Sequence, residues 1–251
     1  MGEGEWIYGR NPVLEALRAE RRVIKKIEIA SGAKLDGPLE DIALLAEERS
    51  LPLRKVPKED LERVHPNHQG VLALTSEYGY ASMEAVFDRA ADRDENPFIL
   101  LLDIIQDPQN LGTLLRTAEA VGVHGVVIAT KRSATVTPAV VSASSGASEH
   151  LLIAQYNIAQ AIRFLKERGV WVAGLEGSDQ AQPLKKVDLS GPIALVVGHE
   201  GSGLRRLVRE SCDYLVRIPM RGAVESLNAA VAGSIALFHV WERRDFEGSK
   251  A

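Results

Sequence analysis

Three polar segments in the second half of the chain carry residues that could do chemistry. The segment D-P-Q-N-L-G-T-L-L-R contains Asn110 and Arg116, G-H-E-G-S-G contains Glu200, and P-M-R-G-A-V-E-S-L-N ends with Ser226 and Asn228. Glycine-rich turns can present backbone N–H groups to a ligand, and an arginine can stabilise charge that develops during a reaction. The three segments therefore suggest a polar site built from loops that lie far apart in the sequence.

Each of these residues also has a purely structural interpretation. Asn110 and Ser226 stand at expected helix starts, where either side chain can act as an N-cap. Arg116 lies off the apolar stripe of its helix and can simply be solvated, and Glu200 can favour the next helix through the helix dipole. Asn228 falls in a first helical turn, where its side chain competes with the backbone. A Ser-x-Asn at a helix start is nevertheless more polar than capping requires.

Several other chemistries lack their sequence signatures. The glycine-rich loop has the order G-x-x-G-x-G, whereas a dinucleotide-binding turn has G-x-G-x-x-G, and no G-K-[ST] follows it. His199 and His239 have no evident nucleophile partner, and the 6 histidines show no metal-ligand spacing. A nicotinamide-dependent oxidoreductase is therefore a weak alternative, and no metal is expected.

The elements around the second and third segments follow from the apolar pattern. The run Ile193–Val197 predicts a buried strand, Leu204–Glu210 a short helix and Tyr214–Ile218 a second strand. A loop over Pro219–Glu225 then leads into a long helix, Ser226–Arg244. Both polar loops thus leave the carboxyl ends of strands, which is the edge where α/β sheets bind ligands.

The rest of this half predicts an α/β fold with a mostly parallel sheet and helices on both faces. Strands expected over Phe98–Ile105, Gly125–Ala129, Leu151–Gln155 and Val170–Leu175 alternate with helical patterns. One of these patterns places Leu111, Leu114, Leu115, Ala118 and Val121 at helical spacing. The small-residue stretch 138–148 predicts a short helix.

The first 76 residues predict a separate small α/β domain. Asn11 and Pro12 indicate a helix start, with asparagine as N-cap and proline in the first helical position. Strands are expected over Val23–Ala30, Leu51–Val56 and Gly70–Leu74, and helices over Leu39–Glu48 and Lys58–Val64. Residues 77–96 are polar and acidic toward their end and predict a linker with one helical turn or more, so the second domain covers residues 97–251.

The composition indicates the cellular compartment of the protein. The 251 residues carry a net charge of −4 and a single cysteine, which excludes an internal disulfide and fits a reducing compartment. No secretory signal is visible, and no apolar run approaches the roughly 20 residues that span a bilayer. We therefore expect a cytoplasmic protein without membrane contact.

Nucleic-acid binding would need local basic patches, because the overall charge is negative. Two such patches occur in the first domain: Arg21, Arg22, Lys25 and Lys26, and then Arg54, Lys55 and Lys58. The alternative is a solvated surface whose charge is nearly cancelled by acidic neighbours. In the last helix, apolar residues occupy most of the circumference, so both sides of the helix must pack against other parts of the protein. A second subunit could supply part of this packing, which makes a homodimer plausible.

Taken together, the three segments resemble the SpoU–TrmH family of RNA 2′-O-ribose methyltransferases, within the SPOUT class of trefoil-knotted enzymes. The family motif N-x-G-x-x-x-R matches at Asn110, Gly112 and Arg116. The motif G-x-E-G-x-G matches at Gly198, Glu200, Gly201 and Gly203, and I-P-M-x-G-x-x-x-S-L-N matches from Ile218 to Asn228. Y-G-R-N-P-V-L-E-A-L (Tyr8–Leu17) and H-Q-G (His68–Gly70) resemble the family's substrate-binding domain, which has a ribosomal-protein-type RNA-binding fold.

The resemblance implies a C-terminal knot that binds S-adenosylmethionine. Backbone groups around Gly198, Ile218 and Leu227 would hold the cofactor, with Met220 adding to the wall. Asn110, Arg116, Glu200, Ser226 and Asn228 would form the catalytic set. The nearest branch methylates a guanosine ribose of 23S ribosomal RNA, free or in a ribosome assembly intermediate. Related members act on tRNA, and a non-catalytic RNA-binding module of the same fold is a further alternative.

Overall fold

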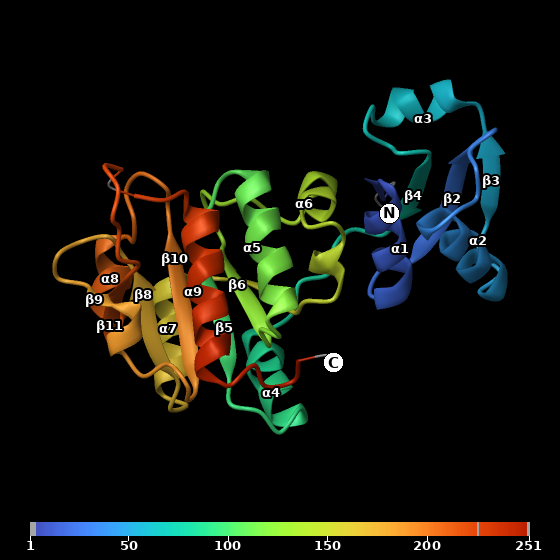
Figure 1. Cartoon of the computed structure of the whole chain (residues 1–251). Helices are drawn as coiled ribbons and strands as arrows, with labels where there is room; N and C mark the ends of the chain where they lie inside the picture. The colour runs from blue at the N-terminus through green and yellow to red at the C-terminus, as the bar shows by residue number, and fades with distance from the viewer. Residues whose placement is uncertain (1–3, 225, 250–251) are drawn as a thin grey trace. The chain divides into compact units, whose positions relative to one another are not determined.

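The computed structural model describes residues 4–224 and 226–249, which form two compact units (Figure 1). The first unit contains the chain up to Gly79 together with Val136–His150. The second contains Tyr80–Thr135 and the chain from Leu151 onward. The polypeptide therefore crosses between the units three times, which the sequence did not indicate.

The first unit is built on a four-stranded sheet with the order β1-β4-β2-β3. Its strands are β1 (Glu5–Tyr8), β2 (Ile24–Ala30), β3 (Leu53–Val56) and β4 (Val71–Thr75), and its helices are α1 (Arg10–Ala19), α2 (Pro38–Glu48), α3 (Lys58–Val64) and α6 (Pro138–Ala143), with a 3₁₀ turn η1 (Ala147–Glu149). Strand β2 runs parallel to β3 and antiparallel to β4, which also pairs antiparallel with β1. The expected strands and helices are present within a residue or two, and β1 is an addition to them.

The start of α1 differs from the expectation. The N-cap residue is Gly9, so Asn11 and Pro12 are the second and third helical residues instead of the cap and the first position. Gly9 has a φ of 96°, a conformation that glycine adopts without steric cost and that turns the chain directly from β1 into the helix. Pro12 is tolerated because amides of the first turn have no intrahelical acceptor.

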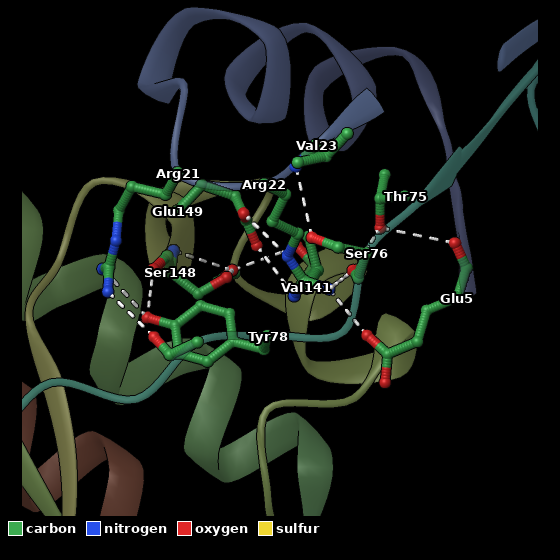
Figure 2. A network of polar contacts seen from close by, with 12 residues as sticks. Glu5, Arg21, Arg22, Val23, Thr75, Ser76, Tyr78, Val141, Ser148 and Glu149 are labelled. Carbon is green, nitrogen blue, oxygen red and sulfur yellow. Dashed lines mark hydrogen bonds and ion pairs between the residues drawn. The ribbon is translucent and has the colours of Figure 1, made fainter. Parts of the chain in front are cut away.

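A buried ion pair joins η1 to the N-terminal part of the first unit (Figure 2). The guanidinium of Arg22 donates to both carboxylate oxygens of Glu149, from Nε at 3.0 Å and from Nη2 at 3.1 Å, and from Nη1 to Glu5 at 2.6 Å. The Tyr78 hydroxyl donates to the carbonyl of Ser148 at 3.1 Å. The side chain of Arg22 is 1% exposed and that of Glu149 is 0% exposed. Arg22 is thus a structural residue, and it belongs neither to an exposed basic patch that could bind RNA nor to a solvated surface, the two alternatives for this cluster.

The second unit contains a seven-stranded, parallel sheet with the order β7-β6-β5-β10-β8-β11-β9. Its strands are β5 (Phe98–Asp103), β6 (Gly125–Ala129), β7 (Ile153–Tyr156), β8 (Trp171–Leu175), β9 (Gln182–Pro183), β10 (Ile193–Gly198) and β11 (Tyr214–Arg217). Its helices are α4 (Met83–Asp92), α5 (Pro108–Ala120), α7 (Ile158–Lys166), α8 (Arg206–Ser211) and α9 (Ala229–Arg243), with a 3₁₀ turn η2 (Leu184–Lys186). The parallel α/β fold expected from the sequence is confirmed.

Helices cover both faces of this sheet. On one face, Met83 and Val86 of α4 pack with α7, α8 and alternate strand residues in a buried core. On the other face α5 and α9 lie side by side (Figure 1). A side chain at Gly233 of α9 would meet Leu114 of α5 at 2.5 Å and Val197 of β10 at 3.2 Å, so this glycine permits the close approach. Within the described residues, no helix is long and apolar enough to cross a bilayer.

A buried histidine makes the stability of the second unit depend on pH. Nδ1 of His124 accepts from the amide of Phe98 at 3.0 Å, and Nε2 lies 3.0 Å from Glu95. Burial lowers the pKa of His124 from its ordinary 6.5, and Arg93 adds to this effect while Glu95 opposes it. Below pH ~6.5 the unfolded chain therefore binds more protons than the folded protein.

We expect the urea midpoint of the second unit to fall as the pH drops from about 7.5 to 5.5, and to level off below the lowered pKa. The substitution His124→Asn keeps an acceptor for the Phe98 amide and removes the titrating group, so its midpoint should fall less over the same interval. An equal fall in both proteins would contradict this assignment.

Candidate active site

The carboxyl ends of β8, β10 and β11 border a cavity of about 290 Å³. The four residues expected to hold a cofactor, Gly198, Ile218, Met220 and Leu227, all line it. Glu200 and Ser226 of the expected catalytic set also line it. The structure adds residues that the sequence did not single out, including Leu175, Glu176, Gly177 and Arg217. These lie at strand ends or just after them, which was the available signal.

The glycine-rich loop folds back on itself at the end of β10. His199 and Gly203 exchange two backbone hydrogen bonds, of 3.1 and 2.9 Å, and Nδ1 of His199 accepts from the amide of Gly201 at 3.1 Å. A Cβ atom on Gly198 would lie 2.5 Å from the carbonyl carbon and oxygen of Gly203. Gly198 is therefore required for the turn that carries Glu200 and forms a wall of the cavity.

The substitution Gly198→Ala should abolish tight binding of S-adenosylhomocysteine, because the added methyl group meets backbone that has to move. Isothermal titration calorimetry would measure the loss, which we expect to exceed about tenfold, the equivalent of roughly 1.4 kcal/mol. Gly191→Ala is the matched control, since a Cβ there meets nothing within 4 Å. Unchanged affinity in Gly198→Ala would show that this turn does not shape the binding site.

A buried carboxylate fixes the far end of the same loop. Asp103, at the end of β5 and fully buried, accepts from the Arg205 amide at 3.0 Å and from its Nε at 2.8 Å. The following residue, Ile104, has a φ of 63°, a strained conformation for a β-branched side chain. Strained backbone and a buried carboxylate thus lie together at the turn between β5 and α5, which leads to Asn110.

The three polar segments meet at Glu200. Nδ2 of Asn228 donates to Oε1 of Glu200 at 2.9 Å and to Oδ1 of Asn110 at 3.1 Å, and Nδ2 of Asn110 donates to the same carboxylate oxygen. The three side chains come from α5, from the loop after β10 and from the start of α9. One carboxylate held by two carboxamides is a preorganised polar group beside the cavity.

The helix starts explain why these amides are available. The N-cap of α5 is Asp107, which accepts from the amide of Gln109 at 3.0 Å, so Asn110 is not the cap. The N-cap of α9 is Asn228 and not Ser226, and its Oδ1 accepts from Ala230 at 2.9 Å and Val231 at 3.2 Å. The helix expected to begin at Ser226 therefore begins at Ala229. Asn228 caps it with its oxygen and binds Glu200 with its nitrogen.

Arg116 lies on α5, six residues after Asn110, and is exposed. It is not among the residues that line the cavity. Ser226 is also exposed, at the cavity itself. The roles of both residues in a reaction stay predictions.

The cavity suits a ligand with both apolar and anionic parts. Leu175, Ile218 and Leu227 supply apolar wall. Nε of Arg217 is buried, and it forms no hydrogen bond with the part of the chain that the structure describes. An unpaired buried donor is costly, so a ligand acceptor such as a carboxylate would satisfy it. These features fit S-adenosylmethionine, which carries an adenosine and an amino-acid carboxylate.

Comparison with known proteins decides the family. Residues 97–238 match the SpoU rRNA methylase family, and residues 6–81 match the RNA 2′-O ribose methyltransferase substrate-binding family. The chain belongs to the SpoU rRNA methylase family. Its members are RNA 2′-O-methyltransferases that use S-adenosylmethionine, so the enzyme class and cofactor expected from the sequence are confirmed.

Similar proteins match this member of the family over nearly their whole length. A protein from Bacillus subtilis named as a putative TrmH family tRNA/rRNA methyltransferase is 38% identical over 243 residues, 96% of each chain. The 23S rRNA (guanosine-2′-O-)-methyltransferase RlmB of Pseudomonas syringae pv. tomato is 40% identical over 247 residues, covering 97% of this chain and 98% of the relative.

Solved structures give the same result for the fold. The AdoMet-bound rRNA methyltransferase of Sinorhizobium meliloti has a TM-score of 0.76 at 26% identity and covers 96% of this chain and 87% of its own. The SpoU methyltransferase AviRb of Streptomyces viridochromogenes, in complex with AdoMet, has a TM-score of 0.79 at 22% identity and covers 97% and 91%. The trefoil knot expected for this fold stays a prediction.

Proposed function

We propose that this enzyme methylates the ribose 2′-hydroxyl of a guanosine in 23S ribosomal RNA. The cluster of Asn110, Glu200 and Asn228 at the edge of the cavity is the observation that carries the proposal. The relative named RlmB supports ribosomal RNA and guanosine. The name of the Bacillus subtilis relative includes tRNA, so tRNA is the second candidate substrate.

The cavity would hold the cofactor through Gly198, Ile218 and Leu227, with Met220 beside it. Arg217 would bind the carboxylate of its amino-acid part through the unpaired Nε. When bound, S-adenosylmethionine supplies a methyl group already activated by its sulfonium. The remaining task of the protein is to place the 2′-hydroxyl in line with that methyl group and to stabilise the alkoxide as its proton leaves.

The polar cluster would perform that task. Glu200, held by Asn110 and Asn228, would orient Arg116 and the ribose, and Ser226 would contact the ribose or its phosphate. Arg116 would stabilise the developing alkoxide by charge-assisted hydrogen bonds. A guanidinium stays protonated in proteins and is a poor proton acceptor, so we assign Arg116 this electrostatic role.

We further propose that the two units of the chain have different roles. The first unit would bind the RNA substrate, as expected for residues 1–76, and the second would carry catalysis, as expected for residues 97–251. The expected linker over residues 77–96 contains α4, which packs in the core of the second unit. The substrate-binding family match over residues 6–81 supports the first assignment. We place the reaction in the cytoplasm, on free RNA or on a ribosome assembly intermediate.

The experiment that tests the function is transcriptome-wide mapping of 2′-O-methyl sites in cells with and without the gene. We expect one guanosine of 23S ribosomal RNA to lose its methyl group, and the purified protein to restore it with S-adenosylmethionine. Loss of a tRNA site instead would assign the second substrate. An unchanged map, with no methyl transfer in vitro to either RNA, would overturn the proposal.

We propose that the enzyme is a homodimer formed through α9. Val231, Ile235 and Phe238 follow one another at helical spacing and are 47%, 43% and 46% exposed. Apolar side chains in one row on a helix favour a covered face. A second copy of this chain supplies that cover in the proposed dimer.

The substitution Ile235→Asp should convert the dimer into monomers, because it places a charge in the centre of the proposed interface. Sedimentation velocity over a concentration series would show the change. Leu207→Asp, at an apolar residue of α8 that is 63% exposed, is the control and should leave the mass unchanged. A monomeric wild-type protein would rule out this dimer.

A further inference from the structure

The two motifs of the first unit that resemble a substrate-binding domain meet at one pocket. G-R-N-P begins α1, and H-Q-G precedes β4. Oε1 of Gln69 accepts from the amide of Arg10 at 3.1 Å, and Nε of Arg10 donates to the carbonyl of Gln69 at 3.2 Å. The pocket beside them measures about 570 Å³ and is lined by Arg10, Lys58, Glu62, His68, Gln69 and the loop after β2.

His68, a nearly buried residue, presents a hydrogen-bond donor at this pocket. The residue is 4% exposed, and its Nδ1 accepts from the amide of Gly70 at 2.8 Å. Because Nδ1 is an acceptor, the ring proton of the neutral imidazole resides on Nε2. Among residues 4–224 and 226–249, Nε2 has no hydrogen-bond partner. A nearly buried donor of this kind favours a ligand that brings an acceptor.

The His68 ring stays neutral at physiological pH. Burial lowers the pKa of His68 from its ordinary 6.5, although the nearby Glu62 carboxylate opposes this effect. The Nε2 proton is therefore a single fixed donor, as recognition of one acceptor atom requires.

Charged groups surround this donor. Lys58 pairs with one oxygen of Glu62 at 2.9 Å, and Nη1 of Arg10 lies 3.2 Å from Asp36. A donor close to a carboxylate matches guanine, whose O6 accepts and whose N1–H and N2–H₂ groups donate. Lysine and arginine are the usual partners of phosphate. A paired base in an A-form helix hides its Watson–Crick edge, whereas an unpaired base exposes it.

We propose that this pocket binds an unpaired guanosine of the RNA substrate, with His68 donating to O6 and Glu62 accepting from N1–H and N2–H₂. Arg10 and Lys58 would contact the adjoining phosphates. The inference rests on the proposed function only in taking RNA as the ligand. It assigns sequence recognition to a site in the first unit, separate from the cofactor cavity of the second.

Fluorescence anisotropy on the full-length protein tests the proposal, with a labelled uridine nonamer carrying one central guanosine as the probe. We expect tighter binding of this RNA than of the same nonamer with central adenosine, and weaker binding when its complement makes it double-stranded. His68→Gln should lose about tenfold in affinity, the usual scale for one base contact. Equal binding of the guanosine and adenosine nonamers would overturn the proposal.

Two further measurements do not depend on how His68→Gln folds. Inosine in place of guanosine lacks the N2 amine and should weaken binding to the wild-type protein severalfold; unchanged binding would remove the contact between Glu62 and N2–H₂ from the proposal. Lys58→Ala should reduce the slope of log affinity against log salt by about 1. Lys34→Ala is its control, because Lys34 is 86% exposed and does not line the pocket. Equal effects of the two lysine variants would contradict a specific phosphate contact by Lys58.

Methyl transfer separates this proposal from the proposed function. If the wild-type enzyme methylates 23S ribosomal RNA and the His68 and Lys58 variants keep its KM, the pocket is not part of recognition and the function stands. If the enzyme methylates no RNA but still prefers the guanosine nonamer, the pocket stands and the function is wrong.

Discussion

Arg116→Lys should lower kcat for methyl transfer by about 100-fold, the usual scale for losing one donor to a developing oxyanion. Lysine keeps the positive charge but loses the planar fork that can engage an oxygen and a second group together. Arg116 is exposed and lies outside the cofactor cavity. The dissociation constant of S-adenosylhomocysteine should therefore stay the same.

Single-turnover transfer of a labelled methyl group to 23S ribosomal RNA would measure this effect. Arg163→Lys is the matched control, since Arg163 is an exposed arginine on α7 of the same unit. Turnover near the wild-type value in Arg116→Lys would remove Arg116 from the reaction. A parallel loss in Arg163→Lys would indicate a general effect of surface charge on RNA binding.

Arg22→Met should destabilise the first unit by about 3–5 kcal/mol, the cost usually found when one partner of a buried ion pair is removed. The Glu149 carboxylate would remain buried without a partner, because its side chain is 0% exposed and both of its oxygens accept hydrogen bonds from Arg22. Burial already raises the pKa of Glu149, and Arg22 works against that rise. Without Arg22, folding would have to protonate this carboxyl group or bury its charge.

Hydrogen exchange of peptides from β1 to β4 would measure the loss within the first unit alone. The double variant Arg22→Met, Glu149→Leu should recover much of it, because two apolar side chains can replace a buried pair. Arg18→Met is the control, since the side chain of Arg18 is 48% exposed in its surface pairs and such pairs contribute about 0–1 kcal/mol. A loss below about 1 kcal/mol in Arg22→Met would show that the pair is dispensable.

Local sequence patterns were sufficient to predict most of the helices and strands. Apolar runs located the parallel strands, and the helix over Lys58–Val64 was predicted to the residue. Strand β1 was missed because it has four residues, and its pairing with β4, some 65 residues later, is what stabilises it. The start of α1 was misplaced because Asn11 and Pro12 form a common helix signal, while the conformation of Gly9 depends on that strand.

The candidate site was predictable as a set of residues but not as an arrangement. The three motifs named Asn110, Glu200 and Asn228, and the structure joins them at one carboxylate oxygen. A lone aspartate in an apolar strand does not indicate its partner, so the bonds between Asp103 and Arg205 could not be foreseen. Arg217 had a weak signal, as a polar residue at a strand end directly before Ile218. The small residues of 138–148 gave no sign that they pack with the first unit.

The placement of Val136–His150 has a consequence for synthesis on the ribosome. The first unit is complete only with residues encoded more than 50 positions after Gly79. A nascent chain that has emerged as far as Gly79 holds the β1–β4 sheet, but Arg22 lacks the carboxylate that it meets in the finished protein. Domains usually fold as they emerge, N-terminal part first. In this chain the first unit cannot complete its folding until Glu149 has been synthesised. The elements β5, α5 and β6 of the second unit are therefore synthesised before the first unit is complete.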